Sequence, residues 1–319
     1  MKHSSTLAAL SICLLVSTPV MAGLFSKEPQ PILLEAKTDR AEALKQLVDD
    51  DSVLKDLSKA ESLAAKKVAI GKVHITILTE TSGGAAKTSG SQSARAWMNY
   101  KLLGVTPETV QAITDKFYVD LKNALTKQGY EVLSPEKLLV DAGFKEAVEA
   151  TKSPEVDSSY IAASAKKTAI PTGIMQIKQF TDLSKTLGNI PVIDVDISLN
   201  FAEFKAEGKL SGDKIQASLE ATTRLSINSG HINVYFDSLD SISKMPFKQA
   251  VILPGQIVER VVDKGSSLGD KALTAFFALG KSSYSGNTLE VTVVKNYAEI
   301  VSGNLQPFAE VVSSVLKKQ

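Results

Sequence analysis

Apolar and polar residues alternate with a period of two along the segment 191–236. Successive side chains of a strand point to opposite faces, so this alternation predicts strands with one buried face. Turn residues at Gly208, 211–213 and 228–230 divide the segment into three runs, which predicts an antiparallel meander. The apolar positions are Ile193, Val195, Ile197, Leu199 and Phe201, then Ile215, Ala217, Leu219, Ala221, Leu225 and Ile227, then Ile232, Val234 and Phe236.

Other elements follow from helical spacing and from end signals. The helix over 106–129 has the clearest ends, because Thr106 suits an N-cap, Pro107 the first helical position and Gly129 a C-terminal stop. In the strand over 68–80 the apolar frame shifts at Gly71, which predicts a bulge. The remaining elements expected before the meander are helices over 40–48, from 52 onward, over 134–148 with a weak point at Gly143, and over 181–188, a turn at 171–173, and strands over 130–133 and 174–177.

After Phe236 the pattern becomes mainly helical. The spacing predicts helices over 257–262 and 267–279, a strand over 289–293 and a final helix over 297–316. Pro307 is expected to divide that final helix in two, because proline removes a backbone donor.

Residues 81–103 have a different composition, rich in glycine, serine and alanine, which favours a mobile loop. Its end carries Arg95, Trp97, Met98 and Tyr100, of residue types that are enriched at protein interfaces. We predict these four residues as a partner-binding site. The alternative is that Trp97 and Tyr100 cap the core beside the next helix.

The first residues resemble a secretory signal peptide. Lys2 and His3 precede a short apolar run over 7–16, and Val20 and Ala22 suit a cleavage site, so 1–22 is expected to be removed. The only cysteine, Cys13, lies in this segment, so the mature chain is expected to have no disulfide. These features favour a bacterial periplasm. With 36 basic and 35 acidic residues the net charge is +1, which argues against a nucleic-acid partner.

Catalytic patterns are weak in this sequence. His74 and His231 are far apart in the chain, and His74 falls on the polar side of its strand, where a surface position is expected. Asp194 and Asp196 share a strand face and could bind a divalent cation, but solvated positions suit them better because two carboxylates fall short of a calcium shell. We therefore expect no enzyme activity, no metal and no cofactor.

The order of elements resembles the CsgG-like and TolB N-terminal-like periplasmic domains. The resemblance covers 67–236 and depends on the apolar first strand over 67–80, the helix and strand over 121–133 and the late hairpin over 222–236. It implies an α+β fold with a cell-envelope role as a non-enzymatic, often oligomeric subunit or accessory of a secretion machine.

Together these observations predict an α+β protein with a mostly antiparallel sheet covered by helices. The expected divisions are a signal peptide at 1–22, a helical segment at 23–66, the CsgG-like domain at 67–236 and a mainly helical region at 237–319. The expected function is that of a secretion or assembly accessory in the periplasm or at the outer membrane. It is expected to bind other envelope proteins or itself. The alternatives are a pore-forming outer-membrane oligomer of the curli-channel type and a periplasmic protein that binds a small ligand.

Overall fold

The computed structural model describes residues 30–35, 37–48, 61–89, 92–170, 174–211, 214–238, 242–263, 282–283 and 287–316. The expected signal peptide at 1–22, the turn at 171–173 and the helix over 267–279 lie outside these residues, as does most of the helix expected from 52 onward. Within the described residues the protein is α+β, as predicted.

The described helices and strands alternate irregularly along the chain. The helices are α1 (Arg40–Leu47), α3 (Pro107–Lys127), α4 (Pro135–Leu138), α5 (Ala142–Ala150), α6 (Ile174–Thr186) and α8 (Tyr297–Ser313), with 3-10 turns η1 (Glu61–Ala65) and η2 (Ser314–Leu316). The strands are β1 (Ile32–Leu33), β2 (Lys67–Leu78), β3 (Glu80–Ser89), β4 (Gln92–Leu103), β5 (Glu131–Val132), β6 (Glu155–Val156), β7 (Tyr160–Ser164), β8 (Val192–Ser211), β9 (Lys214–Tyr235), β10 (Ile242–Pro246), β11 (Val251–Ile252), β12 (Val258–Asp263), β13 (Ser282–Ser283) and β14 (Asn287–Val293).

The central sheet is mixed, so the prediction of a mostly antiparallel sheet is wrong. Its order is β1-β11-β9-β8-β2-β7-β6, and β2 runs parallel to β8. Parallel neighbours need a crossover connection, which the helices between these two strands supply. The register between β2 and β8 shifts at Ile70/Lys72, so the bulge predicted at Gly71 is confirmed. A Cβ atom at Gly71 would lie 2.6 Å from a methyl carbon of Val192, which excludes a larger residue there.

The predicted three-stranded meander is instead one long hairpin, β8–β9. Gly208 pairs with Ala217 inside the hairpin, so no turn occurs there. Pairing continues to Ser211 opposite Lys214, and the predicted turn residues 212–213 lie outside the described residues. Ser229 and Gly230 belong to β9, and the register shift beside them corresponds to a bulge. Glycine is required there for close approach, since a Cβ at Gly230 would lie 2.4 Å from the carbonyl oxygen of Asp196. The residue types at 228–230 suit a bulge as well as a turn, so the turn predicted there is wrong.

Within 81–103, the described residues 81–89 and 92–103 belong to the antiparallel pair β3–β4, so the predicted mobile loop is wrong. The small residues allow another strand to come close: a Cβ at Gly83 would lie 2.3 Å from Cγ of Phe204 on β8. Met98, Tyr100 and Leu102 alternate on β4 and are buried. Tyr100 meets Phe204 edge to face, with ring centroids 5.4 Å apart.

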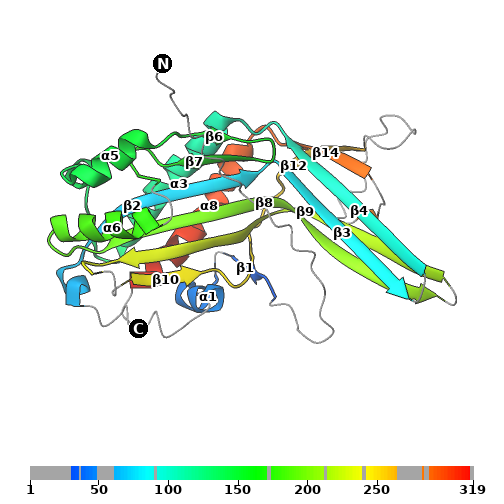
Figure 1. Ribbon diagram of the computed structural model, residues 1–319, viewed down its shortest axis with the longest axis horizontal. Coiled ribbons are helices and arrows are strands. Elements are labelled where there is room, and N and C mark those ends of the chain that lie inside the picture. Colours follow the sequence, from blue (N-terminus) through cyan, green and yellow to red (C-terminus); the bar gives the residue numbers. More distant parts are fainter. Residues whose placement is uncertain are drawn as a thin grey trace, which may run out of the picture.

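A second sheet, in the order β12-β14-β4-β3, packs part of this hairpin against β8 and β9. The ends of the two hairpins extend together from one end of the molecule (Figure 1). We call this extension, β3–β4 with residues 202–223 of β8–β9, the arm. The helix predicted over 257–262 is wrong, because Val258, Val261 and Val262 lie on strand β12. Residues 242–263 and 287–293 supply strands to both sheets, so the described part of 237–319 is not mainly helical.

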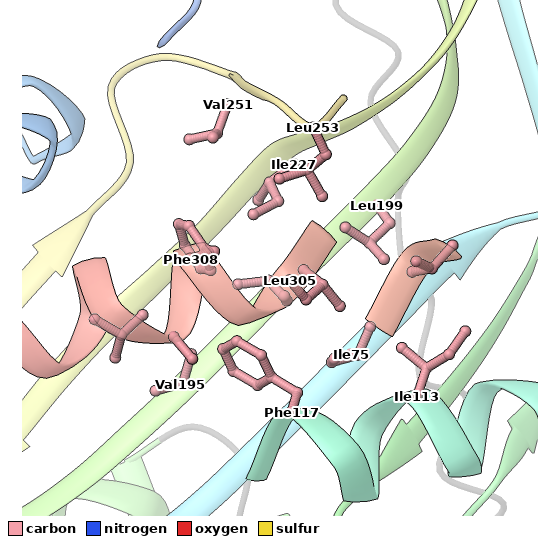
Figure 2. Close-up of a cluster of buried hydrophobic side chains, with 14 of the residues drawn as sticks. Ile75, Ile113, Phe117, Val195, Leu199, Ile227, Val251, Leu253, Leu305 and Phe308 are labelled. Carbon is pink, nitrogen blue, oxygen red and sulfur yellow. The ribbon is translucent and has the colours of Figure 1, made fainter. Parts of the chain in front are cut away.

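Helices cover both faces of the central sheet away from the arm, and we call this part the body (Figure 1). On one face, Phe117 of α3 and Phe308 of α8 stack with centroids 6.2 Å apart and contact the apolar side of β2, β8 and β9 (Figure 2). On the other face, Phe180 of α6 packs on Tyr235 of β9, and Phe144 of α5 packs on Phe180. The apolar face predicted for β8, from Ile193 to Phe201, is fully buried.

Several helix predictions are confirmed. Thr106 caps α3, and Gly129 follows it with φ +88°. The predicted helix over 40–48 is α1. Among the described residues, no helix has the length and apolar character needed to cross a membrane.

Other helix predictions need correction. Residues 174–177 belong to α6 and not to a strand, and Asp141 caps a separate helix α5, so 134–148 is not one helix. Helix α8 continues through Pro307 without division. Its apolar side is almost entirely buried against α3 and the sheet, and this packing outweighs the single backbone hydrogen bond that proline removes.

Candidate functional site: a buried charged network on the central sheet

Polar side chains line up across three neighbouring strands on the face that α6 partly covers. In one row, Lys72 of β2 is opposite Asp194 of β8, which is opposite Asn233 of β9. In the next row, His74, Asp196 and His231 occupy the same three strands. Directly opposite residues of a sheet lie on the same face, so the registers bring all six side chains together.

Lys72 is the cation at the centre of this network. Its Nζ lies 2.8 Å from Oδ2 of Asp196 and 3.9 Å from Oδ1 of Asp194. The side chains of Lys72 and Asp194 are only 5% and 0% exposed. A buried charge without a partner costs several kcal/mol, and here the ammonium and the carboxylate compensate each other.

The two oxygens of Asp194 are used very unequally. Oδ2 accepts hydrogen bonds from Nδ2 of Asn233 at 3.0 Å, from Nε2 of His231 at 3.3 Å, from the hydroxyl of Tyr235 at 3.3 Å and from Nε2 of Gln176 on α6. Oδ1 is buried and has no hydrogen-bond partner among the described residues; its nearest cation is Lys72. One carboxylate oxygen thus faces four donors.

Burial and neighbouring charges shift three pKa values in this network. Burial lowers the pKa of His74, and this effect exceeds the opposing attraction of Asp196. Burial alone would raise the pKa of Asp196, but Lys72 and His74 lower it more, so it lies below its usual value. Burial, followed by the charge of Asp194, raises the pKa of Tyr235 far above neutrality. At neutral pH these effects favour neutral His74, ionised Asp196 and neutral Tyr235.

The geometry is that of a closed ion pair and not of an open metal centre. The Lys72 ammonium lies between the two carboxylates, where a cation would have to bind. In the described parts of the chain no group of three histidines, cysteines or carboxylates is arranged to hold a metal ion.

A serine also touches the network, because Oγ of Ser164 lies 3.0 Å from Nδ1 of His74. That serine is 2% exposed, so its hydroxyl does not face a substrate.

The sequence identified part of this site. It predicted that Asp194 and Asp196 share a face, and the network confirms this. The prediction that both are solvated is wrong for Asp194, which is fully buried, because α6 covers that end of the sheet. His74 is half-buried rather than on the surface. Lys72 was missed, although its position on the polar side of the 68–80 strand, in the frame of His74, could have indicated it.

The predicted partner-binding residues do not gather on one surface. Trp97 of β4 is 49% exposed and pairs with Gly84 of β3, whereas Met98 and Tyr100 point to the opposite side and are buried. Tyr100 therefore belongs to the core, as the alternative held, while Trp97 does not. The backbone of Arg95 pairs with Ala86 in the same hairpin. Of the three described side chains, Trp97 is left as the contact candidate.

Two shallow grooves of about 290 and 310 Å³ adjoin each other between α1, α3 and α8, away from the charged network. Both share Ala124, Lys127 and Glu310. Most of their lining residues are polar, and two of them, Arg40 and Glu310, pair with each other at 3.0 Å. These grooves offer less than the enclosed apolar pockets typical of small-ligand sites.

A scan against protein-family models, a search of curated proteins and a search of solved structures each found no match.

Proposed function

We propose that this chain is a non-enzymatic protein of the bacterial cell envelope, exported to the periplasm, that acts by binding other envelope proteins or a second copy of itself. The observation that carries the proposal is the arm, which extends from the body (Figure 1) and carries Trp97, the only tryptophan of the chain, with its side chain half-exposed. The sequence supports the location through the signal-like residues 1–22 and the resemblance to CsgG-like domains.

Trp97 is an unusual residue to leave exposed on a strand. Its cross-strand neighbour is Gly84, so no side chain from that position covers the indole ring. Tryptophan is enriched among the residues that contribute most to protein interfaces. Four residues further along β4, Lys101 forms a surface pair with Glu80 at 3.2 Å, so the same hairpin also carries exposed polar groups of the kind found at the rim of interfaces.

The backbone of the arm offers a second mode of binding. Strand β3 ends the order of its sheet, so its outer edge has no strand partner among the described residues. Its ten residues include Gly83 and Gly84 and no proline, and proline is one of the usual means of protecting an edge. An extended segment of a partner can add to such an edge through main-chain hydrogen bonds.

The charged network supports the non-enzymatic part of the proposal. Its most reactive groups are paired with one another, and Asp194, Lys72 and Ser164 are all buried. A network of this kind fixes the relative positions of strands and helices, which suits a scaffold.

Affinity capture from periplasmic extract tests the proposal. The tagged chain should retain a specific envelope protein or a second copy, and Trp97→Ala should weaken this retention by tenfold or more, about the loss expected for an interface anchor. Val119→Ala is the matched control, because Val119 is 46% exposed on α3 of the body. A chain that captures nothing and stays monomeric at high concentration would contradict the proposal. If Trp97→Ala and Val119→Ala have equal effects, Trp97 is not the interface anchor.

A second candidate function is a pore-forming oligomer of the outer membrane, of the curli-channel type. The length of β8 and β9, 20 and 22 residues, favours it, since about 9–11 residues suffice to span a bilayer. Washing membranes with carbonate or urea separates the two candidates. A peripheral accessory is released by the wash, whereas an inserted oligomer is extracted only by detergent.

A further inference from the structure

Helix α6 is held on the central sheet by apolar contacts and by one polar side chain. Phe180 and Leu183 are fully buried against the sheet. Among the described side chains of α6, Gln176 is the one with hydrogen bonds to the sheet: its Nε2 donates to Oδ2 of Asp194 and to the hydroxyl of Tyr235 at 3.2 Å. The polar attachment of the N-terminal end of α6 therefore depends on Asp194.

More donors lie around Oδ2 of Asp194 than this oxygen can accept hydrogen bonds from at once. A carboxylate oxygen offers about two lone pairs, yet Gln176, His231, Asn233 and Tyr235 all lie within hydrogen-bond distance of it. These donors compete, and the outcome depends on their relative strength. Three of them stay uncharged across physiological pH, while histidine changes its charge between about pH 8 and pH 5.

Protonation of His231 would change this competition. Its side chain is 33% exposed, so a proton from solvent can reach the ring. A charged imidazolium makes a shorter and roughly twice as strong hydrogen bond to a carboxylate as a neutral donor does. The present distance of 3.3 Å leaves room for that shortening.

We infer that Asp194, His231 and Gln176 form an acid-sensitive contact: when His231 gains a proton it takes over Oδ2 of Asp194 and displaces Gln176, which loosens the N-terminal end of α6. The groups that bear on this step come from every strand around it. The charged and titratable neighbours are Lys72 and His74 of β2, Asp194 and Asp196 of β8, Tyr235 of β9, the exposed Lys244 opposite Asn233 on β10, and Glu155 of β6, which acts on His74.

The net charge of these neighbours supports the replacement of Gln176 by a charged His231 at Asp194. With both histidines neutral, Lys72 balances only one of the two carboxylates, Asp194 and Asp196, so the inner network carries one excess negative charge. One proton on His231 removes that excess. Nδ1 of His74 lies 3.0 Å from Oγ of Ser164, whereas Nε2 of His231 lies 3.3 Å from Oδ2 of Asp194, so His231 is the histidine whose proton bears directly on this oxygen.

Hydrogen exchange of the full chain, read by mass spectrometry at about pH 7.5 and pH 5.5 and corrected for intrinsic rates, tests the inference. The protection of peptides from 174–186 should fall by about tenfold at the lower pH, as expected for the loss of a hydrogen bond to a charged group. Peptides from α3, 107–127, are the internal control and should change much less. His231→Gln should abolish the fall, and His74→Gln should leave it in place.

Two results would overturn the inference: unchanged protection of α6 between the two pH values, or a fall that persists in His231→Gln. If His231→Gln does not fold, nuclear magnetic resonance of the wild-type chain gives the answer. The side-chain amide signals of Gln176 should shift with the same midpoint as the ring of His231. Signals that do not move, or that follow His74, exclude the proposed displacement.

Discussion

Strands β8 and β9 pass through two regions that differ in how they are covered. In the body, residues 192–200 lie between helices on both faces, and even the charged Asp194 is fully buried. In the arm, the same two strands pack face to face with the hairpin β3–β4, and Phe204 against Gly83 and Tyr100 is a central contact. The body therefore holds most of the described core, whereas the arm is thin and leaves Trp97 open for contacts.

The comparison also separates two ways of handling charge. One lysine of the body, Lys72, is buried with Asp194, and neither group can be removed alone without leaving the other uncompensated. One lysine of the arm, Lys101, is half-exposed beside Glu80, where water already solvates both. A pair of lysine and carboxylate thus fixes structure in one region and contributes little in the other.

Lys72→Met should have the largest effect on stability. It leaves buried Asp194 without its cation, so we expect a loss of about 3–5 kcal/mol in the free energy of unfolding. Lys101→Met is the matched control and should cost less than about 1 kcal/mol, because exposed ion pairs contribute little. Urea denaturation at neutral pH measures both, and equal losses would contradict the contrast between body and arm.

Aromatic truncation should show the same contrast in apolar contacts. Phe117→Ala removes a ring that is buried in the body against Phe308, at an expected cost of about 3–5 kcal/mol. Phe204→Ala, in the arm, removes a ring that is only partly buried, so its cost should be roughly half as large. The midpoints of urea denaturation rank the two, and a larger effect at Phe204 would place the main core in the arm.

Gly83→Ala should destabilise the arm by about 1–3 kcal/mol, the usual cost of overpacking, because the added methyl group would overlap Phe204. Gly84 is exposed on the other side of β3, so Gly84→Ala is the control with a smaller effect. The double substitution Gly83→Ala with Phe204→Ala should cost less than the sum of the two single ones. Strict additivity in this double-mutant cycle would show that the two residues do not compete for space.

Stability should fall as the solution is acidified. The pKa of His74 is lowered in the folded protein, so below about pH 6.5 the unfolded chain binds this proton more readily than the folded chain does. The free energy of unfolding therefore becomes smaller as the pH falls. The lowered pKa of Asp196 adds a further loss, which begins near the unfolded value of about 3.8 and grows as the pH falls through the folded value.

Urea denaturation across this pH range measures the effect. His74→Gln should remove the component near pH 6 and leave the acidic one, whereas a wild-type stability that rises between about pH 6.5 and pH 5 would contradict the attribution to His74.

The sequence predicted elements whose signals are local. Helix α3 carries its cap, its proline and its terminal glycine within one segment, and the apolar face of β8 follows from alternation alone. It failed where distant residues decide. The glycines of β3 resemble a loop until Phe204 is placed against them, and Asp194 resembles a solvated residue until α6 covers it. Likewise, residues 258–262 form a strand because β14 pairs with them.

The partner-binding site illustrates the same limit. Residue type alone grouped Trp97 with Met98 and Tyr100, but strand alternation separates them, and this alternation was visible once 92–103 was considered as a strand. Only part of the charged network could be predicted. The two carboxylates share one strand, which the alternation shows, whereas Lys72 lies 122 residues before Asp194 in the chain. Pairing between strands so distant in sequence leaves no local signal.

The proposed binding role of the arm is tested most directly by site-specific photo-crosslinking in intact cells. A photoreactive residue in place of Trp97 should yield a crosslink to another envelope protein or to a second copy, and the same residue in place of Val119 on the body should yield none. The opposite pattern, or no crosslink from either position, would contradict the assignment of the arm as the binding region.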